Sequence, residues 1–380
     1  MHPALRHLAP ALAKTFQDAG FTAAGIEDCL GSHGIAALYR GEPAAVRYYA
    51  RGNSRIELLI RIILLRDAAD HTTVIELLGE ATTQGLIDAG ALRFEDSNVL
   101  RFQIDIRPHV LLGEHHWIFS DADAAMTEHI PAPEHVLGVG AASLSLVHAT
   151  PTTPVNTLLD LGCGSGVQAL AQSRTARKIT ATDIHPRALE FAAASLAASN
   201  VDAEFLAGPW FEPVQGRRFD RIVANPPFVV GLPEIGHIYR DSGLDLDGAS
   251  ELVISQAPQH LHIGGCAIML AAWIHQDGVP WQHRVASWLP DTGVAAWVLQ
   301  RDVADPAHYV GTWLKDESLD PRSITSAART EAWLEHFAKA GVTGIGFGFV
   351  AIQRLADNIE SDIVCEEMPQ QFTDPLGTEI

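Results

Sequence analysis

The sequence predicts an α/β fold in which a doubly wound, mostly parallel sheet follows a helix-rich N-terminal module with a β-hairpin. Between Leu158 and Gln353, short apolar runs alternate with segments of helical periodicity, as strands and helices do in such a sheet. Before residue 120 the periodicity is mainly helical and becomes strand-like only near its end. From Asp357 onward there are seven acids and no Lys or Arg. We therefore expect a module that resembles a winged helix (residues 1–120), a linker with one helix (121–157), the sheet domain (158–355) and a loosely ordered acidic tail (356–380).

The composition indicates a sizeable core and a strongly acidic balance. Of 380 residues, 47% are hydrophobic, and 26 Lys and Arg stand against 46 Asp and Glu, for a formal net charge of −20. This charge argues against a surface that coats nucleic acid non-specifically, although it is compatible with a local basic patch. The four cysteines form no C-x-x-C pair, and no apolar run is long enough to span a membrane. We expect a cytoplasmic protein with free thiols and no membrane partner.

Apolar residues at helical spacing predict several helices in the N-terminal module. Gly20, Gly31 and Gly90 each follow the end of one such segment, as glycine commonly does after a helix. Pro43 suits the first turn of another helix. The predicted helices cover Ala4–Ala19, Ala23–Leu30, a segment from Pro43, Arg55–Ala69, Val74–Leu78 and Thr82–Ala89, and the strand-like runs cover Val99–Ile106, Val110–Leu112 and Trp117–Phe119.

A run of arginines within this module is a candidate contact surface. Arg47, Arg51 and Arg55 are spaced four residues apart, so on one continuous helix they would form a single basic ridge, with Tyr48 and Tyr49 beside it. Such a ridge could bind RNA or an acidic partner. Against this, the Gly-Asn-Ser sequence before Arg55 makes a continuous helix doubtful, and a solvated helix face with charged neighbours has the same pattern.

The second half of the chain follows the order of a doubly wound sheet, after a predicted helix over Ala141–His148. The predicted strands are Leu158–Asp160, Lys178–Asp183, Glu204–Leu206, Asp220–Ala224, Cys266–Ala272, Gly293–Leu299 and, last, Gly344–Gln353. The predicted helices between them are Val167–Ser173, Pro186–Ser199, Gly248–Leu261 (followed by a turn at Gly264-Gly265), Val279–Trp288, Pro306–Leu314 and Ala328–Ala340. Because helices separate the strands, we expect neighbouring strands to run parallel.

The stretch LLDLGCGSG, residues 158–166, is a candidate ligand-binding turn. Asp160 stands where the first strand ends, and Gly162, Gly164 and Gly166 permit a tight turn into the next helix. A strand, a glycine turn and a helix N-terminus bring backbone N–H groups close to a ligand. The G-x-G-x-G spacing differs from the G-x-G-x-x-G of dinucleotide-binding folds, which disfavours a nicotinamide-dependent oxidoreductase.

Three further features follow strands and are therefore expected at the same edge of the sheet, where ligands bind in such folds. Asp183 ends the second strand, where its carboxylate can accept hydrogen bonds from both hydroxyls of a ribose. The turn Gly208–Pro213 follows the third strand, and Asn225–Phe228, with the sequence NPPF, follows the fourth.

The NPPF tetrapeptide is the most specific of these features. Pro226 and Pro227 fix the backbone and remove two N–H donors, so the carbonyl groups of Asn225 and Pro226 stay available as acceptors. The Asn225 side-chain oxygen and one backbone carbonyl can accept both hydrogens of a planar NH₂ group and aim its nitrogen at an electrophile. Phe228 can stack on that flat group. Catalysis at such a site would consist mainly of positioning and would need no metal ion.

The glycine turn, the acid of ATDIHPRALE and the sequence VANPPF together resemble a class I S-adenosylmethionine-dependent methyltransferase, whose sheet is Rossmann-like. The NPPF sequence resembles the branch that methylates amino and amide nitrogens, which includes release-factor glutamine methyltransferases and small-domain ribosomal RNA methyltransferases. The resemblance covers about residues 136–275. It implies that the acceptor is held by Asn225, Pro226, Pro227 and Phe228. It also implies that S-adenosylmethionine lies against Asp160, Gly162, Cys163, Gly164, Gly166, Asp183, Ile184, Gly208, Trp210 and Asn225.

Two positions bear on how the cofactor binds. Relatives usually carry an acid in the turn after the third strand, where it binds the adenine amino group, whereas this chain has Pro209. Proline supplies no carboxylate, so we expect weaker cofactor binding, with Trp210 or Phe211 covering the ring. Ser143 lies where relatives often have a hydroxyl group near the cofactor carboxylate.

We interpret the chain as an N-methyltransferase that acts on a macromolecule, because a small acceptor would not need the N-terminal module. The acidic balance and the GLDLDG sequence favour a protein glutamine, such as that of a release factor. The alternative is a base of ribosomal or transfer RNA (guanine N2 or adenine N6), which Arg47, Arg51 and Arg55 favour. A methyltransferase-like binding module without activity is a further alternative, supported by Pro209. Cys163 is interpreted as a small turn residue rather than a catalytic thiol, and no histidine or acidic spacing indicates a metal site.

Overall fold

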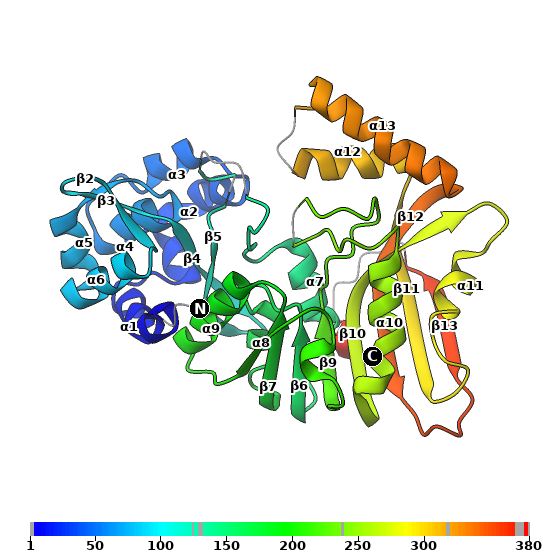
Figure 1. The fold of residues 1–380 in the computed structure, drawn as a ribbon. Helices are drawn as coiled ribbons and strands as arrows, with labels where there is room; N and C mark the ends of the chain where they lie inside the picture. Colours follow the sequence, from blue (N-terminus) through cyan, green and yellow to red (C-terminus); the bar gives the residue numbers. More distant parts are fainter. Residues whose placement is uncertain are drawn as a thin grey trace.

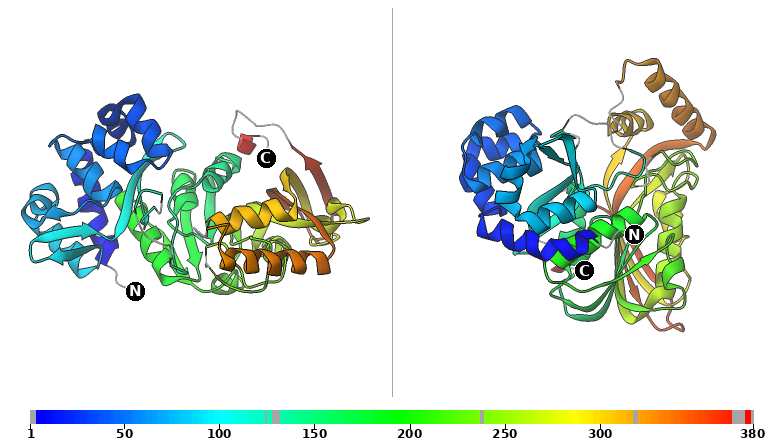
Figure 2. Two further views of the ribbon diagram at one scale, coloured as in Figure 1. Left: turned by 90° about the horizontal axis from the view of Figure 1, so that it is seen from above. Right: turned by 60° about the vertical axis from the view of Figure 1, so that its left-hand side comes forward.

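The computed structural model describes residues 4–123, 125–127, 132–236, 239–316, 320–368 and 376–378. The molecule is elongated, with the N-terminal helices at one end, the parallel strands in the middle and the C-terminal strands at the other end (Figure 1, Figure 2). Within these described residues, no helix is long and apolar enough to cross a membrane.

The N-terminal helices pack against one another and against a helix of the sheet domain. They are α1 (Ala4–Asp18), α2 (Ala23–Tyr39), α3 (Pro43–Tyr49), α4 (Arg55–Leu59), the π-helical turn η1 (Ile60–Leu64), α5 (His71–Leu78), which follows the short strand β1 (Ala69–Asp70), and α6 (Glu80–Asp88). Buried Phe16 and Phe21 share one core with Phe191 of α9 (Pro186–Ala198). An apolar core therefore continues from the N-terminal helices into the sheet domain.

Two hairpins follow these helices. β2 (Leu92–Asp96) pairs with β3 (Val99–Phe102), and β4 (Ile104–Leu111) pairs with β5 (Glu114–Asp121). β5 is attached to both neighbours, because the Trp117 indole N–H donates to the Phe21 carbonyl at 2.8 Å and the Phe119 N–H donates to Ser195 Oγ of α9 at 2.9 Å. The expected hairpin is present, but the run predicted as one strand over Val99–Ile106 divides between β3 and β4.

The arginines do not form one helical ridge. α3 ends at Tyr49 and α4 begins at Arg55, so Arg47, Arg51 and Arg55 lie on different segments. Arg47 forms an ion pair with Asp67 at 2.6 Å, and the Arg51 guanidinium lies 4.2 Å from the centre of the Tyr48 ring. Arg55 donates to the Leu77 carbonyl. The doubt about a continuous helix is confirmed, because the chain turns between the two helices, where Ser54 caps α4.

The C-terminal half forms an eight-stranded sheet in the order β13-β11-β12-β10-β9-β6-β7-β8, and the fold class is as predicted. Among the described strands of this sheet, β12 alone runs antiparallel to its neighbours. The strands are β6 (Val155–Leu161), β7 (Ala176–Asp183), β8 (Glu204–Ala207), β9 (Phe219–Ala224), β10 (Leu261–Gln276), β11 (Val294–Ala304), β12 (Val342–Arg354) and β13 (Asp362–Glu367). The helices are α7 (Ala141–Ala149), α8 (Val167–Ala171), α9, α10 (Gly248–Gln256), α11 (Trp281–Ala286), α12 (Pro306–Asp316) and α13 (Ile324–Lys339), with the 3₁₀ turns η2 (Glu212–Val214), η3 (Ala257–His260) and η4 (Leu376–Thr378).

Several boundaries differ from the sequence predictions. Gly31 (φ 65°) kinks α2 rather than ending it. β10 already begins at Leu261 and includes the predicted turn at Gly264-Gly265, where its pairing with β9 is irregular. β13 lies within the expected loosely ordered tail. It pairs with β11, and Ile363 and Cys365 pack against the core. These hydrogen bonds and this burial order the strand despite its acidic residues. The tail prediction is wrong for these residues, and residues 369–375 and 379–380 lie outside the described chain.

Gly166 has a packing role, and its replacement by alanine is expected to destabilise the protein. Its φ is 84°, and an added Cβ would lie 2.8 Å from Leu196 Cδ1 and 3.2 Å from the Ala192 backbone of α9. Strain and overpacking together are expected to cost about 2–4 kcal/mol in the free energy of unfolding, measured with urea. Gly216→Ala is the matched control, since Gly216 has φ 75° but open space around it. Gly216→Ala is expected to lower the free energy of unfolding by about 1 kcal/mol. If both variants lowered it equally, the packing role of Gly166 would be contradicted.

Candidate active site

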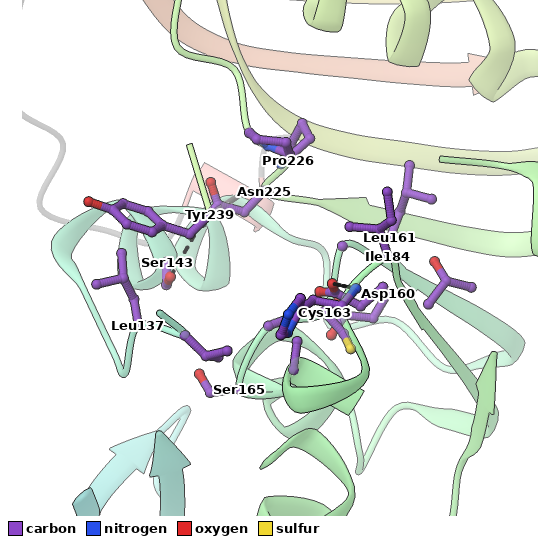
Figure 3. A pocket seen from close by; sticks show the side chains of 18 of the residues that line it. Leu137, Ser143, Asp160, Leu161, Cys163, Ser165, Ile184, Asn225, Pro226 and Tyr239 are labelled. Atoms are coloured by element: carbon purple, nitrogen blue, oxygen red, sulfur yellow. Dashed lines mark hydrogen bonds between the residues drawn. The ribbon is translucent and has the colours of Figure 1, made fainter. Parts of the chain in front are cut away.

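A cavity of about 440 Å³ opens at the carboxyl ends of β6, β7, β8 and β9. In Figure 3, Leu137, Ser143, Asn225 and Tyr239 form one wall, and Asp160, Cys163 and Ile184 form the other. The loops after all four strands contribute, as expected for a parallel sheet. The sequence-predicted residues that line the cavity are Ser143, Asp160, Gly162, Cys163, Gly164, Asp183, Ile184, Gly208, Pro209, Trp210, Asn225, Pro226 and Pro227. Gly166 and Phe228 are not among them.

The glycine turn is attached to β7 through its own N–H groups. The N–H groups of Gly162 and Cys163 both donate to the Thr182 carbonyl at 2.9 Å, and the Gly164 N–H donates to Asp183 Oδ2 at 3.0 Å. Gly162 and Gly164 have φ values of 71° and 52°, which this tight return of the chain requires. We expected these N–H groups to face a ligand. Instead, they fix the turn, so these three N–H groups are not available to a ligand.

Asp160 is a buried carboxyl group in the wall of the cavity. It is 1% exposed, and its Oδ2 accepts a hydrogen bond from the Ala169 N–H at 2.9 Å. Burial, with a smaller contribution from the nearby charge of Asp183, raises the pKa of Asp160 to about 7. The single backbone hydrogen bond lowers the pKa but offsets only part of this shift.

The raised pKa of Asp160 predicts a pH-dependent stability. In the unfolded chain this carboxyl is ionised well below pH 6. In the folded state it binds a proton up to about pH 7, so its contribution to stability is lost as the pH rises through 7. From pH 6 to pH 8 the free energy of unfolding is expected to fall by about 1.4 kcal/mol more in the wild type than in Asp160→Asn. Urea unfolding of both proteins at the two pH values measures this, and parallel pH profiles would contradict the raised pKa.

Asp183 and Ile184 form adjacent polar and apolar parts of the opposite wall. Asp183 Oδ1 accepts from the His185 N–H at 2.9 Å, while Oδ2 accepts from Gly164. Burial raises the Asp183 pKa, and these backbone donors oppose that effect. Ile184 lines the cavity yet remains 57% exposed, so it offers an uncovered apolar surface to a ligand. Together they suit a ligand with hydroxyl groups next to a flat apolar ring.

The turn after β8 contributes an aromatic wall in place of a charge. Gly208, Pro209 and Trp210 line the cavity, and Trp210 has a positive φ of 49°. Non-glycine residues rarely adopt this backbone conformation, which makes Trp210 a strained residue at the cavity. Phe211, by contrast, is buried and stacks on His260 with ring centres 4.5 Å apart, so Trp210 is the aromatic residue available here.

Cys163 is a protonated, buried thiol. It is 6% exposed, and burial raises the pKa of Cys163 well above its usual value, with the charges of Asp183 and Asp160 adding to the shift. A thiolate nucleophile is therefore disfavoured at this position. Across the described part of the chain, no group of three or more His, Cys, Asp or Glu side chains is arranged to hold a metal ion.

Asn225 stands at the end of β9 with its amide oriented by α7. Asn225 Nδ2 donates to Ser143 Oγ at 3.4 Å (Figure 3). The Ser143 carbonyl accepts from Gln168 Nε2 at 2.9 Å. No described group donates to the Asn225 side-chain oxygen, which leaves this oxygen as an acceptor. Phe228 instead packs on Phe347, with ring centres 5.3 Å apart, so the cavity gives no support to its predicted contact with the acceptor.

Two segments line the cavity without having been predicted to do so. His135, Val136 and Leu137 come from the linker, and the Val136 N–H donates to Asp121 Oδ2 at the end of β5. Asp121 also accepts from Arg187 Nε at 3.0 Å, which ties this segment to α9. The second segment follows NPPF and contributes Ile235, Tyr239, Asp241 and Ser242. The polar RDSGLDLDG sequence was a signal for the second segment, whereas nothing in the linker marked the first.

Comparison with known families identifies two regions of the chain. Residues 137–276 match the model of the family described as methyltransferase small domain. Residues 18–101 match a family described as a domain of unknown function (DUF7059). The first match covers the glycine turn, Asp183 and Asn225. The second lies within the N-terminal helices and hairpin.

Curated relatives and solved structures resemble parts of the chain. The ribosomal RNA small subunit methyltransferase C of Yersinia enterocolitica is 38% identical over 110 residues, which is 28% of this chain and 28% of the relative. The protein of the same name from Yersinia pestis is 37% identical over the same length and shares. The chain thus spans little more than a quarter of these relatives. A T. thermophilus 16S rRNA N2 methyltransferase, solved with AdoMet and guanosine, is 18% identical, covers 58% of each chain and has a TM-score of 0.35.

Proposed function

We propose that this chain, a class I S-adenosylmethionine-dependent methyltransferase with a methyltransferase small domain over residues 137–276, methylates an exocyclic amino nitrogen of a ribosomal RNA base. The observation that carries transfer to a planar nitrogen is the Asn225-Pro226-Pro227 turn, which lines the same cavity as Asp160 and Asp183. A planar amino group and a methyl donor could therefore meet within one cavity.

The residues on the cofactor side fit S-adenosylmethionine. The Asp183 carboxylate would accept hydrogen bonds from the two ribose hydroxyls, and Ile184 and Trp210 would pack on the adenine. Asp160 and the glycine turn would hold the methionine part. When bound, S-adenosylmethionine supplies an electrophilic methyl group. Pro209 leaves the adenine amino group without the carboxylate that relatives have, so recognition of adenine would depend on shape and on backbone carbonyls.

On the acceptor side, the chain positions a nitrogen rather than removing a proton. The Asn225 side-chain oxygen and the Pro226 carbonyl would accept both N–H bonds of a planar amino group and aim its nitrogen lone pair into the cavity. Ser143 keeps the Asn225 amide oriented for this purpose. Catalysis would then come from orientation and from preorganised acceptors, which together can lower a barrier by several kcal/mol.

An RNA base is a better proposal than the protein glutamine favoured on the sequence alone. The Asn-Pro turn would accept either NH₂ group, so this turn does not discriminate between them. The matching curated relatives are named ribosomal RNA methyltransferases, which supports the RNA acceptor. The acidic balance does not exclude RNA, because a net charge of −20 says nothing about the charges close to one cavity.

The test is incorporation of labelled methyl groups from S-adenosylmethionine into small ribosomal subunits, naked 16S RNA and release factors. The substrates come from cells that lack the gene, so that the acceptor is unmodified. Label in RNA, recovered as N2-methylguanosine or N6-methyladenosine after digestion, supports the proposal and identifies the base. Label only in the release factor would overturn the RNA acceptor. Label in none of the three substrates would overturn the proposed activity on these acceptors.

A further inference from the structure

We propose that α12 and α13 position the acceptor wall of the cavity, so that they control transfer to the acceptor and leave cofactor affinity unchanged. This inference rests on the proposed function. The two helices lie between β11 and β12, outside residues 137–276. We use the name acceptor segment for residues 226–236 and 239–247, which follow Asn225 and supply Ile235, Tyr239, Asp241 and Ser242 to the cavity. In Figure 1, α12 and α13 stand at the top of the view, above this segment.

The first anchor is a hydrogen bond from the start of the acceptor segment to α12. The Val230 N–H donates to the Tyr309 hydroxyl at 2.8 Å, and Val230 is fully buried. Burial raises the pKa of Tyr309, so its hydroxyl stays neutral and keeps its proton. Since Val230 is five residues from Asn225, this bond fixes the chain where it leaves the NPPF turn.

The second anchor is Arg240, which connects both halves of the segment to α12. Arg240 is 2% exposed, and its Nη1 donates to the Trp313 carbonyl at 3.0 Å. The guanidinium also lies 5.8 Å from the centre of the Trp313 ring and 3.2 Å from Asp241. The Arg240 carbonyl accepts from the Val229 N–H at 3.1 Å. Arg240 therefore sets the position of the cavity residues on either side of it.

The third anchor belongs to α13. His336 Nε2 lies 2.8 Å from Asp245 Oδ1, and a Cβ added to Gly231 would meet the Trp333 ring at 3.3 Å. Trp333 is 6% exposed and shares a core with Val229, Val230 and residues of β12, the strand that follows α13. α13 therefore contacts the acceptor segment through packed aromatic side chains as well as through the His336–Asp245 interaction.

These residues act through the segment rather than on a ligand. Of the described residues that line the cavity, none belongs to α12 or α13. The cofactor wall is fixed separately, because the glycine turn and Asp183 bond to each other and to β7. Tyr309, Trp313 and Trp333 are thus positioning residues for one wall only. Loosening them is expected to misplace the acceptor and to leave the cofactor contacts intact.

The experiment compares Tyr309→Phe with the wild type and with Tyr39→Phe. Phenylalanine keeps the ring and removes the Tyr309 hydroxyl, which among the described residues is the only acceptor of the Val230 N–H. Loss of an acceptor for one buried donor changes an equilibrium by a factor of roughly 5 to 150. We expect kcat/KM for RNA to fall about tenfold, within that range, while the S-adenosylmethionine Kd from calorimetry stays within about twofold. The Tyr39 side chain is 83% exposed, so Tyr39→Phe should match the wild type in every measurement.

Hydrogen exchange provides a readout that needs no activity. In Tyr309→Phe without ligand, peptides containing Val229–Gly231 and Arg240–Leu246 should exchange faster, and peptides of β6 and β7 should not. Gly231→Ala tests the α13 anchor independently and should give the same pattern. If the wild type transfers no methyl group while exchange rises in the segment, the proposed function fails and the positioning role stands.

Three outcomes would overturn the inference. In the first, Tyr309→Phe and Gly231→Ala leave both exchange and acceptor kinetics unchanged. In the second, exchange rises throughout the chain and S-adenosylmethionine affinity falls as much as kcat/KM, which would indicate a general loss of stability. In the third, hydrogen exchange rises in the acceptor segment of the variants, but their kcat and KM for an RNA that the wild type methylates are unchanged.

Discussion

Replacement of Asn225 by alanine is expected to lower kcat about 100- to 1,000-fold and to leave the S-adenosylmethionine Kd within about threefold. In the proposed function the asparagine oxygen would accept one hydrogen of the acceptor amino group, and no described residue nearby duplicates it. Without this acceptor the nitrogen lone pair is no longer aimed, so transition-state stabilisation is lost while cofactor contacts remain. Single-turnover methyl transfer and calorimetry measure the two quantities.

The matched control is Asn156→Ala, because Asn156 is exposed at the start of β6, far along the strand from the cavity. It should retain full activity. Ser143→Ala separates two roles for that serine. If Ser143 orients Asn225, kcat falls several-fold and Kd is unchanged; if it contacts the cofactor, Kd rises. Undiminished turnover in Asn225→Ala would contradict the role given to Asn225.

Replacement of Asp183 by alanine is expected to raise the S-adenosylmethionine Kd about 100-fold or more. The carboxylate would accept two charge-assisted hydrogen bonds from ribose hydroxyls, each worth about 1.5–3 kcal/mol. The substitution also removes the acceptor for the Gly164 and His185 N–H groups, so the glycine turn loses one of its three hydrogen bonds to β7. Both effects weaken binding, which calorimetry measures directly.

Two further variants make this result specific. Asp183→Asn keeps one acceptor oxygen and the side-chain shape, so its Kd should lie between those of the wild type and Asp183→Ala. Asp202→Ala is the surface control, because Asp202 forms an exposed pair with Arg6 at 3.2 Å. If Asp183→Ala bound S-adenosylmethionine as tightly as the wild type, Asp183 would not be a cofactor residue.

Much of the candidate site could be predicted because its components are local. The glycine turn, Asp183 and the Asn225–Pro227 turn each follow a strand, and parallel strands bring their carboxyl ends to one edge. A cavity lined by all three could therefore be predicted without knowing how the side chains pack. Pro209 likewise lines the cavity, where its lack of a carboxylate was anticipated.

Three placements differ from what the sequence predicted because of the surface that each residue or strand meets. Gly166 belongs to the same glycine motif as Gly164, but it faces Leu196 and Ala192 instead of the cavity. Phe228 belongs to NPPF, but it packs on Phe347 from a strand more than 100 positions later. β13 has an acidic composition, yet pairing with β11 orders it. In each case the partner is distant in sequence, so local spacing could not identify it.

The sequence by itself determined the fold class and the edge of the sheet where the cavity lies, and it led to the proposal that the NPPF turn holds a planar amino group. These follow from strand–turn–helix order and from the chemistry of glycine, proline and asparagine, which act within a few residues. Only the tertiary structure decided that the glycine-turn N–H groups bond to β7, that Ser143 orients Asn225, and that α12 and α13 hold the acceptor segment. Those arrangements join residues far apart along the chain, and burial in a shared core is what selects them.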